Sequence, residues 1–366
     1  MENKYLNLCC FQYNPLKLFK HICFILDMAR VFRAKNTCIC LFCLLLLSHS
    51  FYVSAGDIAD VHLKNNVNIN QKIDKYFSNK TYSLNIFLYT DTFDSFENNY
   101  PLLVKLLSGI QANTVYLAFN NKRFSTSKTY STNIKSFIKL AHNNKIKVSA
   151  LIYNDIYPYF NKSYRNNVIK NLKKYLSECA ANEKFDSITS DLEPNTIRKN
   201  IKNIPPSFKL RWDRKNGWGK NGANNKLLSL TISLLQELKK HFPETFISQT
   251  TQFYFNSYVN KGLLTVGNSN DFLKVCDNVI IMCYFNNLSD ITKFSRKNLK
   301  ETTKANSLII CVKTTDKGNP GTTLGGKDVI SLTKILTNIA KKSSKFSSFG
   351  GLAIYDLKGL IQILSK

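Results

Sequence analysis

Acidic residues are scarce in this sequence. The 366 residues include 24 Asp and Glu against 51 Lys and Arg, which gives a formal net charge of +27. Such a balance can indicate a nucleic-acid or anionic-surface partner. However, Lys and Asn are dispersed along the whole chain, and no compact basic stripe with interleaved aromatic residues occurs. We therefore expect no specific nucleic-acid partner, and at most loose attraction to an anionic cell envelope.

Histidine is also rare, and the common cofactor signatures are missing. The five histidines are scattered and show no HExxH spacing, so no metal site is expected. No GxGxxG or GxxxxGK[ST] motif follows the first predicted strand, which argues against a nucleotide-binding open sheet. We expect neither a metal nor an organic cofactor.

Six of the ten cysteines lie in the first 55 residues. The other four, Cys179, Cys276, Cys283 and Cys311, lack CxxC or Cys/His metal spacing, and most of them fall in predicted helices or strands. Buried thiols are therefore expected, with one disulfide as the alternative in an oxidising compartment.

Residues 1–55 have the pattern of a leader with a secretory signal. The apolar run at 38–47 is shorter than the roughly 20 residues of a membrane span. Basic residues precede this run, and the small residues at 53–55 follow it, which predicts cleavage after Ala55 and a secreted or periplasmic protein. An uncleaved signal anchor is the alternative, and Met28 would be a tidier start for the signal.

The rest of the chain belongs to the α/β class. After a polar segment at 56–80, apolar runs alternate with amphipathic stretches that are spaced like the helices of βα units. Eight such alternations favour a single (β/α)8 TIM barrel over residues 81–366, in preference to an open doubly wound sheet. The predicted strands cover residues 84–90, 114–120, 146–153, 185–193, 246–253, 278–284, 307–314 and 351–356.

Two acids lie two positions apart at the end of the fourth predicted strand. Because side chains alternate along a strand, Asp191 and Glu193 should project to the same side, with Thr189 below them as a candidate substrate-binding residue. One acid of such a pair can stay protonated and act as a general acid while the other stays ionised. Asp186 has the opposite parity and is expected to be structural. Structural capping or ion pairing is the alternative for the pair itself.

The longest insertion, residues 195–225, follows this strand and contains both tryptophans. Trp212 and Trp218 could form platforms for sugar rings, or they could pin the loop onto the barrel. Polar side chains at the ends of other predicted strands, including Gln252 and Asn286, could bind sugar hydroxyls.

Three segments together resemble glycosidase family 18, which includes chitinases and endo-β-N-acetylglucosaminidases. Residues 186–193 (DSITSDLE) resemble that family's DGxDxDxE signature on the fourth strand. Met282-Cys283-Tyr284 is similar to its MxY segment on the sixth strand, and 350–355 (GGLAIY) is similar to its eighth-strand GG run. The resemblance spans the chain from about residue 84 to the end.

The resemblance implies substrate-assisted hydrolysis of β-linked glycans that carry N-acetylglucosamine. It makes Glu193 the general acid, Asp191 the residue that orients the 2-acetamido group, and Tyr284 a hydrogen-bond donor to the acetamide carbonyl. No enzyme nucleophile is needed in this scheme, so the substrate must carry an N-acetyl group. Tyr355 would line the site where the family has Trp.

Several positions depart from the family pattern. Thr189 replaces the innermost Asp, Ser187 replaces a Gly, and Phe285 replaces the Asp that usually follows the sixth-strand Tyr. These departures motivate an alternative function, a carbohydrate-binding barrel with weak or absent turnover. A glycosidase of another family, with Asp91 or Asp155 as a nucleophile about 5 Å from Glu193, is a further alternative.

Overall fold

The computed structural model describes residues 67–198, 201, 204–315 and 319–366. The predicted leader, its cleavage site and the first part of the polar segment lie outside the described residues. Within the described residues, no helix has the length and apolar character needed to cross a membrane.

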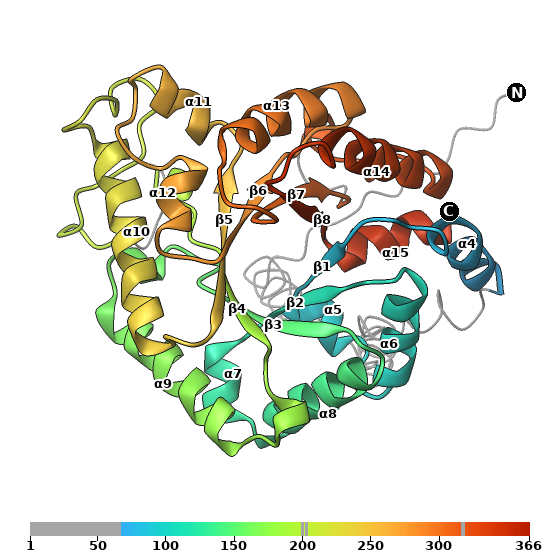
Figure 1. Cartoon of the computed structure of the whole chain (residues 1–366). Helices are drawn as coiled ribbons and strands as arrows, with labels where there is room; N and C mark the ends of the chain where they lie inside the picture. The colour runs from blue at the N-terminus through green and yellow to red at the C-terminus, as the bar shows by residue number, and fades with distance from the viewer. Residues whose placement is uncertain (1–66, 199–200, 202–203, 316–318) are drawn as a thin grey trace, which may run out of the picture. The chain divides into compact units, whose positions relative to one another are not determined.

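Eight parallel strands close into a barrel in sequence order, with β8 pairing back to β1 (Figure 1). Each strand falls within or overlaps one of the eight predicted runs, so the predicted (β/α)8 barrel is confirmed. The strands are β1 (Leu84–Leu88), β2 (Thr114–Ala118), β3 (Lys147–Ile152), β4 (Ser187–Ser190), β5 (Phe246–Gln252), β6 (Asn278–Met282), β7 (Leu308–Lys313) and β8 (Phe349–Tyr355).

Helices surround this barrel and cover the outer surface of the sheet (Figure 1). The α-helices are α4 (Val67–Phe77), α5 (Thr90–Asp94), α6 (Tyr100–Gly109), α7 (Asn121–Thr126), α8 (Lys128–Asn143), α9 (Lys162–Glu178), α10 (Ala223–His241), α11 (Phe255–Asn260), α12 (Ser269–Leu273), α13 (Leu288–Glu301), α14 (Val329–Ser343) and α15 (Leu357–Ser365). Short 3-10 turns are η1 (Tyr157–Tyr159), η2 (Ala181–Glu183), η3 (Pro194–Thr196) and η4 (Pro320–Thr322).

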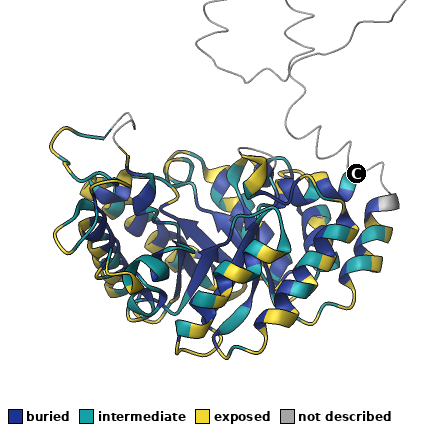
Figure 2. Ribbon diagram, turned by 90° about the horizontal axis from the view of Figure 1, so that it is seen from above, coloured by how far each residue is buried: buried dark blue, intermediate teal, exposed yellow. Residues whose placement is uncertain are grey.

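Buried residues lie along the strands and on parts of the surrounding helices (Figure 2). The buried apolar side chains form two layers, one on each side of the sheet. The larger layer lies between the strands and the helix ring, and its residues include Leu84 and Leu227. The smaller layer fills the barrel interior with Phe87, Tyr116 and Leu151. Alternation along each strand supplies both layers, because successive side chains point to opposite faces. The four cysteines of the barrel are buried free thiols, as predicted.

The segment predicted to be polar contains a helix that packs on the barrel. In α4, Ile69, Ile73 and Phe77 are each at most 3% exposed, and the helix contacts α6, α14 and α15. Their spacing of four residues places them on one helical face. Gly109 permits the close approach, because a Cβ there would lie 2.6 Å from Ile73 Cγ2.

The glycine pair at the start of β8 has a structural reason. Gly351 has φ of +130°, and a Cβ at this position would lie 2.8 Å from the backbone oxygen of Ser83. A residue with a side chain would be strained in that conformation and would collide with the neighbouring backbone. Gly351 therefore allows β8 to approach the entry to β1, and Gly350 allows a similar approach to the backbone before β7, where a Cβ would lie 2.6 Å from the Asn306 carbonyl oxygen.

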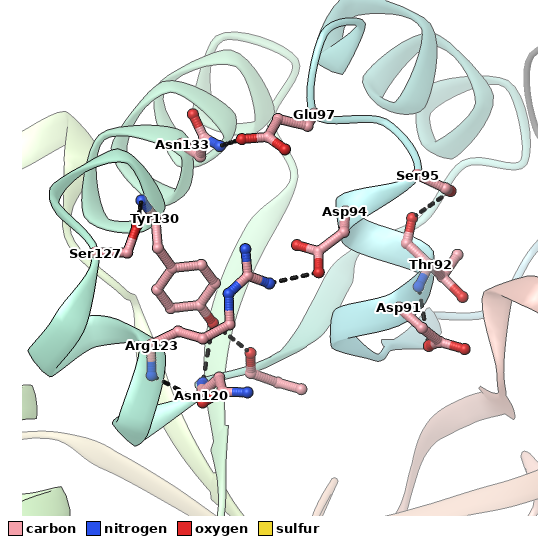
Figure 3. A network of polar contacts seen from close by, with 11 residues as sticks. Asp91, Thr92, Asp94, Ser95, Glu97, Asn120, Arg123, Ser127, Tyr130 and Asn133 are labelled. Atoms are coloured by element: carbon pink, nitrogen blue, oxygen red, sulfur yellow. Dashed lines mark hydrogen bonds and ion pairs between the residues drawn. The ribbon is translucent and has the colours of Figure 1, made fainter. Parts of the chain in front are cut away.

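A polar network joins the loops that follow β1 and β2 (Figure 3). Arg123 on α7 pairs with Asp94 on α5 and lies over the ring of Tyr130, 4.6 Å from its centroid. The Tyr130 hydroxyl donates to the carbonyl of Ala118 at 3.1 Å and accepts from the backbone N–H of Asn120 at 2.9 Å. We define the barrel mouth as the rim at the C-terminal ends of the strands. These contacts join the segments of the mouth that follow β1 and β2.

Candidate functional site

The two acids lie at the barrel mouth directly after β4. The Asp191 N–H still donates to the carbonyl of Ile152 on β3 at 3.0 Å, so the strand pattern continues past Ser190. Leu192, between the acids, is buried, and its carbonyl accepts a hydrogen bond from Gln249 Nε2 at 2.9 Å. With Leu192 held on the opposite side, Asp191 and Glu193 share an orientation. Each is partly buried.

Asp191 is held by β5. Thr250 Oγ1 donates to Asp191 Oδ1 at 2.5 Å, and Thr250 itself is 2% exposed. Thr189, two residues before Asp191, is fully buried, and its hydroxyl shares a hydrogen bond with Ser149 on β3 at 2.8 Å. The polar partner of Asp191 is therefore the hydroxyl of Thr250, which lies on the neighbouring strand.

Glu193 is also bonded to β5, two residues further along that strand. Gln252 Nε2 donates to Glu193 Oε2 at 2.9 Å. The Asn195 side chain and the positive charge of Arg198 act on the same carboxyl group, and both favour its ionised form. The carboxyl group is thus fixed by side chains from β5 and from the segment that follows β4.

Burial and mutual repulsion separate the protonation states of the two acids. Burial raises the pKa of Asp191 above its ordinary value, and the hydrogen bond from Thr250 opposes this shift. Burial raises the pKa of Glu193 further, and the negative charge of Asp191 adds to the effect. As pH rises the pair loses its first proton mainly from Asp191, so that Glu193 keeps its proton beside an ionised Asp191. This is the state that general-acid chemistry needs.

Tyrosine rings from three strand ends line the mouth next to the acids. Tyr355 contacts Tyr284 and Tyr89, with ring centroids 5.5 Å and 5.4 Å apart. Burial raises the pKa of Tyr284 well above its ordinary value, and the charges of Asp191 and Glu193 contribute, so its phenol stays protonated and can donate a hydrogen bond. The structure thus brings together the predicted residues Asp191, Glu193, Tyr284, Gln252 and Tyr355.

Asp186 has the structural role predicted from its parity. Its carboxylate accepts the backbone N–H of Val148 at 2.7 Å and lies 2.8 Å from His142 Nε2 on α8. These bonds join the start of β4 to β3 and α8. The side chain therefore contributes to the barrel wall on the face away from the two acids.

Other predicted site residues are covered or make contacts with neighbours other than the acids. Thr189 has no exposed surface, so we leave it out of the residues that could contact a glycan. Trp212 is only 4% exposed and packs on Phe255 and Trp218, which agrees with the loop-pinning alternative. Trp218 is partly buried against Tyr258. The side chain of Asn286 accepts a hydrogen bond from Asn287 just before α13.

The acids proposed as an alternative nucleophile have other partners. Asp91 lies 3.3 Å from Lys358 Nζ and accepts the backbone N–H of Thr92. Asp155 accepts the Tyr164 hydroxyl at 2.7 Å and the Tyr157 N–H at 2.8 Å. In the part of the chain that the structure describes, no group of three or more His, Cys, Asp or Glu side chains is arranged to hold a metal ion.

Thr250 is the main residue of the site that sequence reasoning missed. It lies two positions before Gln252, and both side chains project to the side of β5 that faces the acids. The same alternation that related Asp191 to Glu193 could have identified it. The Thr residue type did not by itself indicate a functional hydroxyl, because Thr is common in strands for packing reasons alone.

Structural comparison finds this fold among family 18 glycosidases. A GH18 chitinase from Pseudoalteromonas aurantia matches with a TM-score of 0.50 and 16% identity, over 75% of this chain and 93% of that one. The spore cortex-lytic enzyme SleL of Bacillus cereus matches with a TM-score of 0.48 and 10% identity, over 81% and 83%. No protein-family model and no curated protein matches the sequence. The chain therefore has a GH18 chitinase-like fold at low sequence identity.

Proposed function

We propose that this protein is a glycoside hydrolase that cleaves β-linked glycans containing N-acetylglucosamine. The observation that carries the proposal is the pair of acids at the barrel mouth, in which burial and the charge of Asp191 raise the pKa of Glu193. A protonated carboxyl at this position can supply a proton to a glycosidic oxygen. The similarity in fold to a GH18 chitinase agrees with this function.

The mechanism follows the family resemblance and uses residues that lie together in the structure. Glu193 gives its proton to the leaving oxygen as the acetamide oxygen of the substrate attacks the anomeric carbon. Asp191 orients the acetamide N–H and balances the positive charge of the resulting oxazolinium ion, while the Tyr284 phenol donates to the acetamide oxygen. Glu193 then accepts a proton from water as that water attacks the anomeric carbon and reopens the ring.

The acetamide requirement gives a direct test of this function. The full chain is incubated with a β-1,4-linked N-acetylglucosamine oligomer and with the same oligomer after deacetylation, and new reducing ends are measured. We expect cleavage of the acetylated oligomer alone, because the substrate itself supplies the nucleophile. Equal cleavage of both oligomers would contradict the substrate-assisted mechanism, and cleavage of no N-acetylglucosaminide would contradict the function.

Thr250 should position Asp191, in place of the carboxylate that the family has at position 189. We expect Thr250→Val to lower kcat by roughly 10- to 100-fold, since a hydrogen bond to a charged group is worth about 1.5–3 kcal/mol. Because the bond lowers the pKa of Asp191, its loss should move the acidic limb of the pH–rate profile to higher pH. Thr250→Ser keeps the hydroxyl and should restore both properties. An unchanged profile for Thr250→Val would refute this role.

Two departures from the family pattern favour the alternative of a carbohydrate-binding barrel without turnover. No carboxylate lies at position 189, where the Thr189 hydroxyl is bonded to Ser149. The residue after Tyr284 is Phe285 and not an acid. Its ring stacks on Phe294 with centroids 4.9 Å apart. Binding of N-acetylglucosamine oligomers without any release of product, in wild type and Glu193→Gln alike, would establish this alternative.

We also propose export through the secretory pathway, on the basis of the leader pattern at residues 1–55. N-terminal sequencing of the protein from its native source should begin at Gly56. A sequence that begins earlier would contradict cleavage after Ala55.

A further inference from the structure

Gln249 on β5 is a polar residue buried where apolar side chains are expected. It has no exposed surface. Thr250 and Gln252 face the acids, so Gln249 has the opposite parity and projects toward the helix ring. Ile247, two residues earlier on the same side of β5, belongs to the apolar layer between the strands and the helices. Glutamine is mostly exposed in folded proteins, so a fully buried amide needs a reason.

The amide nitrogen of Gln249 binds the peptide group between the two acids. Its Nε2 donates to the carbonyl of Leu192 at 2.9 Å, and Leu192 is itself 1% exposed. A second bond from Nε2, to the carbonyl of Thr250, holds the amide in place. The Leu192 carbonyl belongs to the peptide group that leads directly into Glu193. Rotation of this group would change the directions of the side chains before and after it, and the bond from Gln249 opposes that rotation.

The backbone pairing of β4 with β5 ends just before the acids. The last paired residues are Ser190 and Gln249. From there on, β5 contacts the acid segment through side chains, and three bonds follow one another along it. Gln249 binds Leu192 from the outer side, while Thr250 and Gln252 bind the two acids from the inner side. The segment that carries the acids is therefore held from both faces of the sheet.

The oxygen of the same amide argues against a purely structural role. Gln249 Oε1 is buried and has no hydrogen-bond partner among the residues that the structure describes. The same holds, within those residues, for Ser190 Oγ on the paired position of β4. A buried polar atom without a partner destabilises a fold. An apolar side chain of similar size would avoid this penalty, so stability alone does not explain a glutamine at this position.

We infer that Gln249 is a positioning residue of the hydrolase, whose bond to the Leu192 carbonyl sets the separation of the Asp191 and Glu193 carboxyl groups. The inference rests on the proposed function and adds to it a residue outside the cleft. Gln249 is buried behind the strand and acts through the backbone, so it would not touch the glycan. Its effect on the reaction comes from geometry, because small displacements of catalytic groups lower the rate strongly.

Gln249→Met in the full-length chain tests this inference, because Met has a similar length and lacks the amide. We expect kcat for the N-acetylglucosamine oligomer to fall roughly 10- to 100-fold, while KM changes little since the cleft side chains remain. The alkaline limb of the pH–rate profile should move to lower pH, because a more distant Asp191 raises the pKa of Glu193 less. Gln249→Asn, with an amide one carbon too short to reach the carbonyl, should give the same result.

Asn85→Leu is the matched control for loss of a buried amide. Asn85 lies near the start of β1, is 3% exposed, and donates through Nδ2 to the carbonyl of Leu352 on β8 at 2.9 Å. This variant should lower the urea midpoint but keep wild-type kcat and both pH limbs. Wild-type kcat and limbs in both Gln249 variants would overturn the inference, and so would an equal fall of kcat in Asn85→Leu. Unfolding of both Gln249 variants would assign the residue to the fold and overturn it as well.

Infrared titration separates this inference from the proposed function, because it needs no substrate. The carbonyl band of protonated Glu193, identified by its loss in Glu193→Gln, should disappear at lower pH in Gln249→Met than in wild type. An unchanged titration midpoint would contradict the positioning role. A lowered midpoint in a protein whose wild type hydrolyses no N-acetylglucosaminide would contradict the proposed function and support the positioning of the two acids.

Discussion

Replacing Glu193 with Gln should lower kcat by about 1000-fold, because loss of a general acid typically costs about 100- to 10,000-fold. Gln has the same shape, and its amide oxygen can still accept the hydrogen bond from Gln252 that Glu193 accepts at 2.9 Å. KM should change far less than kcat, since the glycan contacts remain. Reducing-end assays on the N-acetylglucosamine oligomer measure both constants. Glu244→Gln, at an exposed position just before β5, is the matched control and should retain wild-type kcat.

The same substitution should stabilise the protein at alkaline pH. Burial and the charge of Asp191 raise the pKa of Glu193 in the folded state. A carboxyl with a raised folded-state pKa supports the fold at low pH and loses this contribution as pH rises through the folded pKa. Urea unfolding should therefore show Glu193→Gln gaining stability over wild type as pH rises, with little difference below pH of about 4. A constant loss of stability at every pH would indicate a purely structural Glu193.

Asp191→Asn is the second substitution with a large expected effect. We expect kcat to fall by about 100- to 1000-fold, comparable to the loss of one preorganised group that stabilises transition-state charge. Thr250 can still donate to the amide oxygen of Asn, so the fold should persist.

The pH–rate profile gives Asp191→Asn a signature that a structural defect would not produce. The acidic limb, which reports ionisation of Asp191, should disappear. The alkaline limb should move to lower pH, because the negative charge of Asp191 no longer raises the pKa of Glu193. A variant that is slower but keeps both limbs in their wild-type positions would show that Asp191 does not share the protonation equilibrium.

The strands and the acid pair could be predicted because they follow from short-range patterns. Apolar runs separated by helix-length spacers indicated all eight strands, and two-residue alternation placed Asp191 and Glu193 on one side. The helix at 67–77 was missed although Ile69, Ile73 and Phe77 show helical spacing. Its apolar face is narrow, and the surrounding polar residues hide it. The partners of that face, α6, α14 and α15, are distant in sequence and are known only from the structure.

Contacts between strands could not be predicted in the same way. The bond from Thr250 to Asp191 depends on the register of β4 against β5, in which Thr189 lies opposite Ser248. The burial of Trp212 depends on Phe255, which is 43 positions further along the chain. Neither strand register nor long-range packing has a local sequence signal. The sequence therefore could not decide whether Trp212 forms a sugar platform or pins the loop onto the barrel.

The protonation state of Glu193 beside Asp191 is the central claim, and difference infrared spectroscopy tests it directly. Spectra of wild type minus Glu193→Gln at neutral pH should show the carbonyl stretch of a protonated carboxylic acid. Wild type minus Asp191→Asn should show the paired bands of an ionised carboxylate. Carboxylate bands alone in the Glu193 difference spectrum would contradict the account, because an ionised Glu193 has no proton to give to a leaving oxygen.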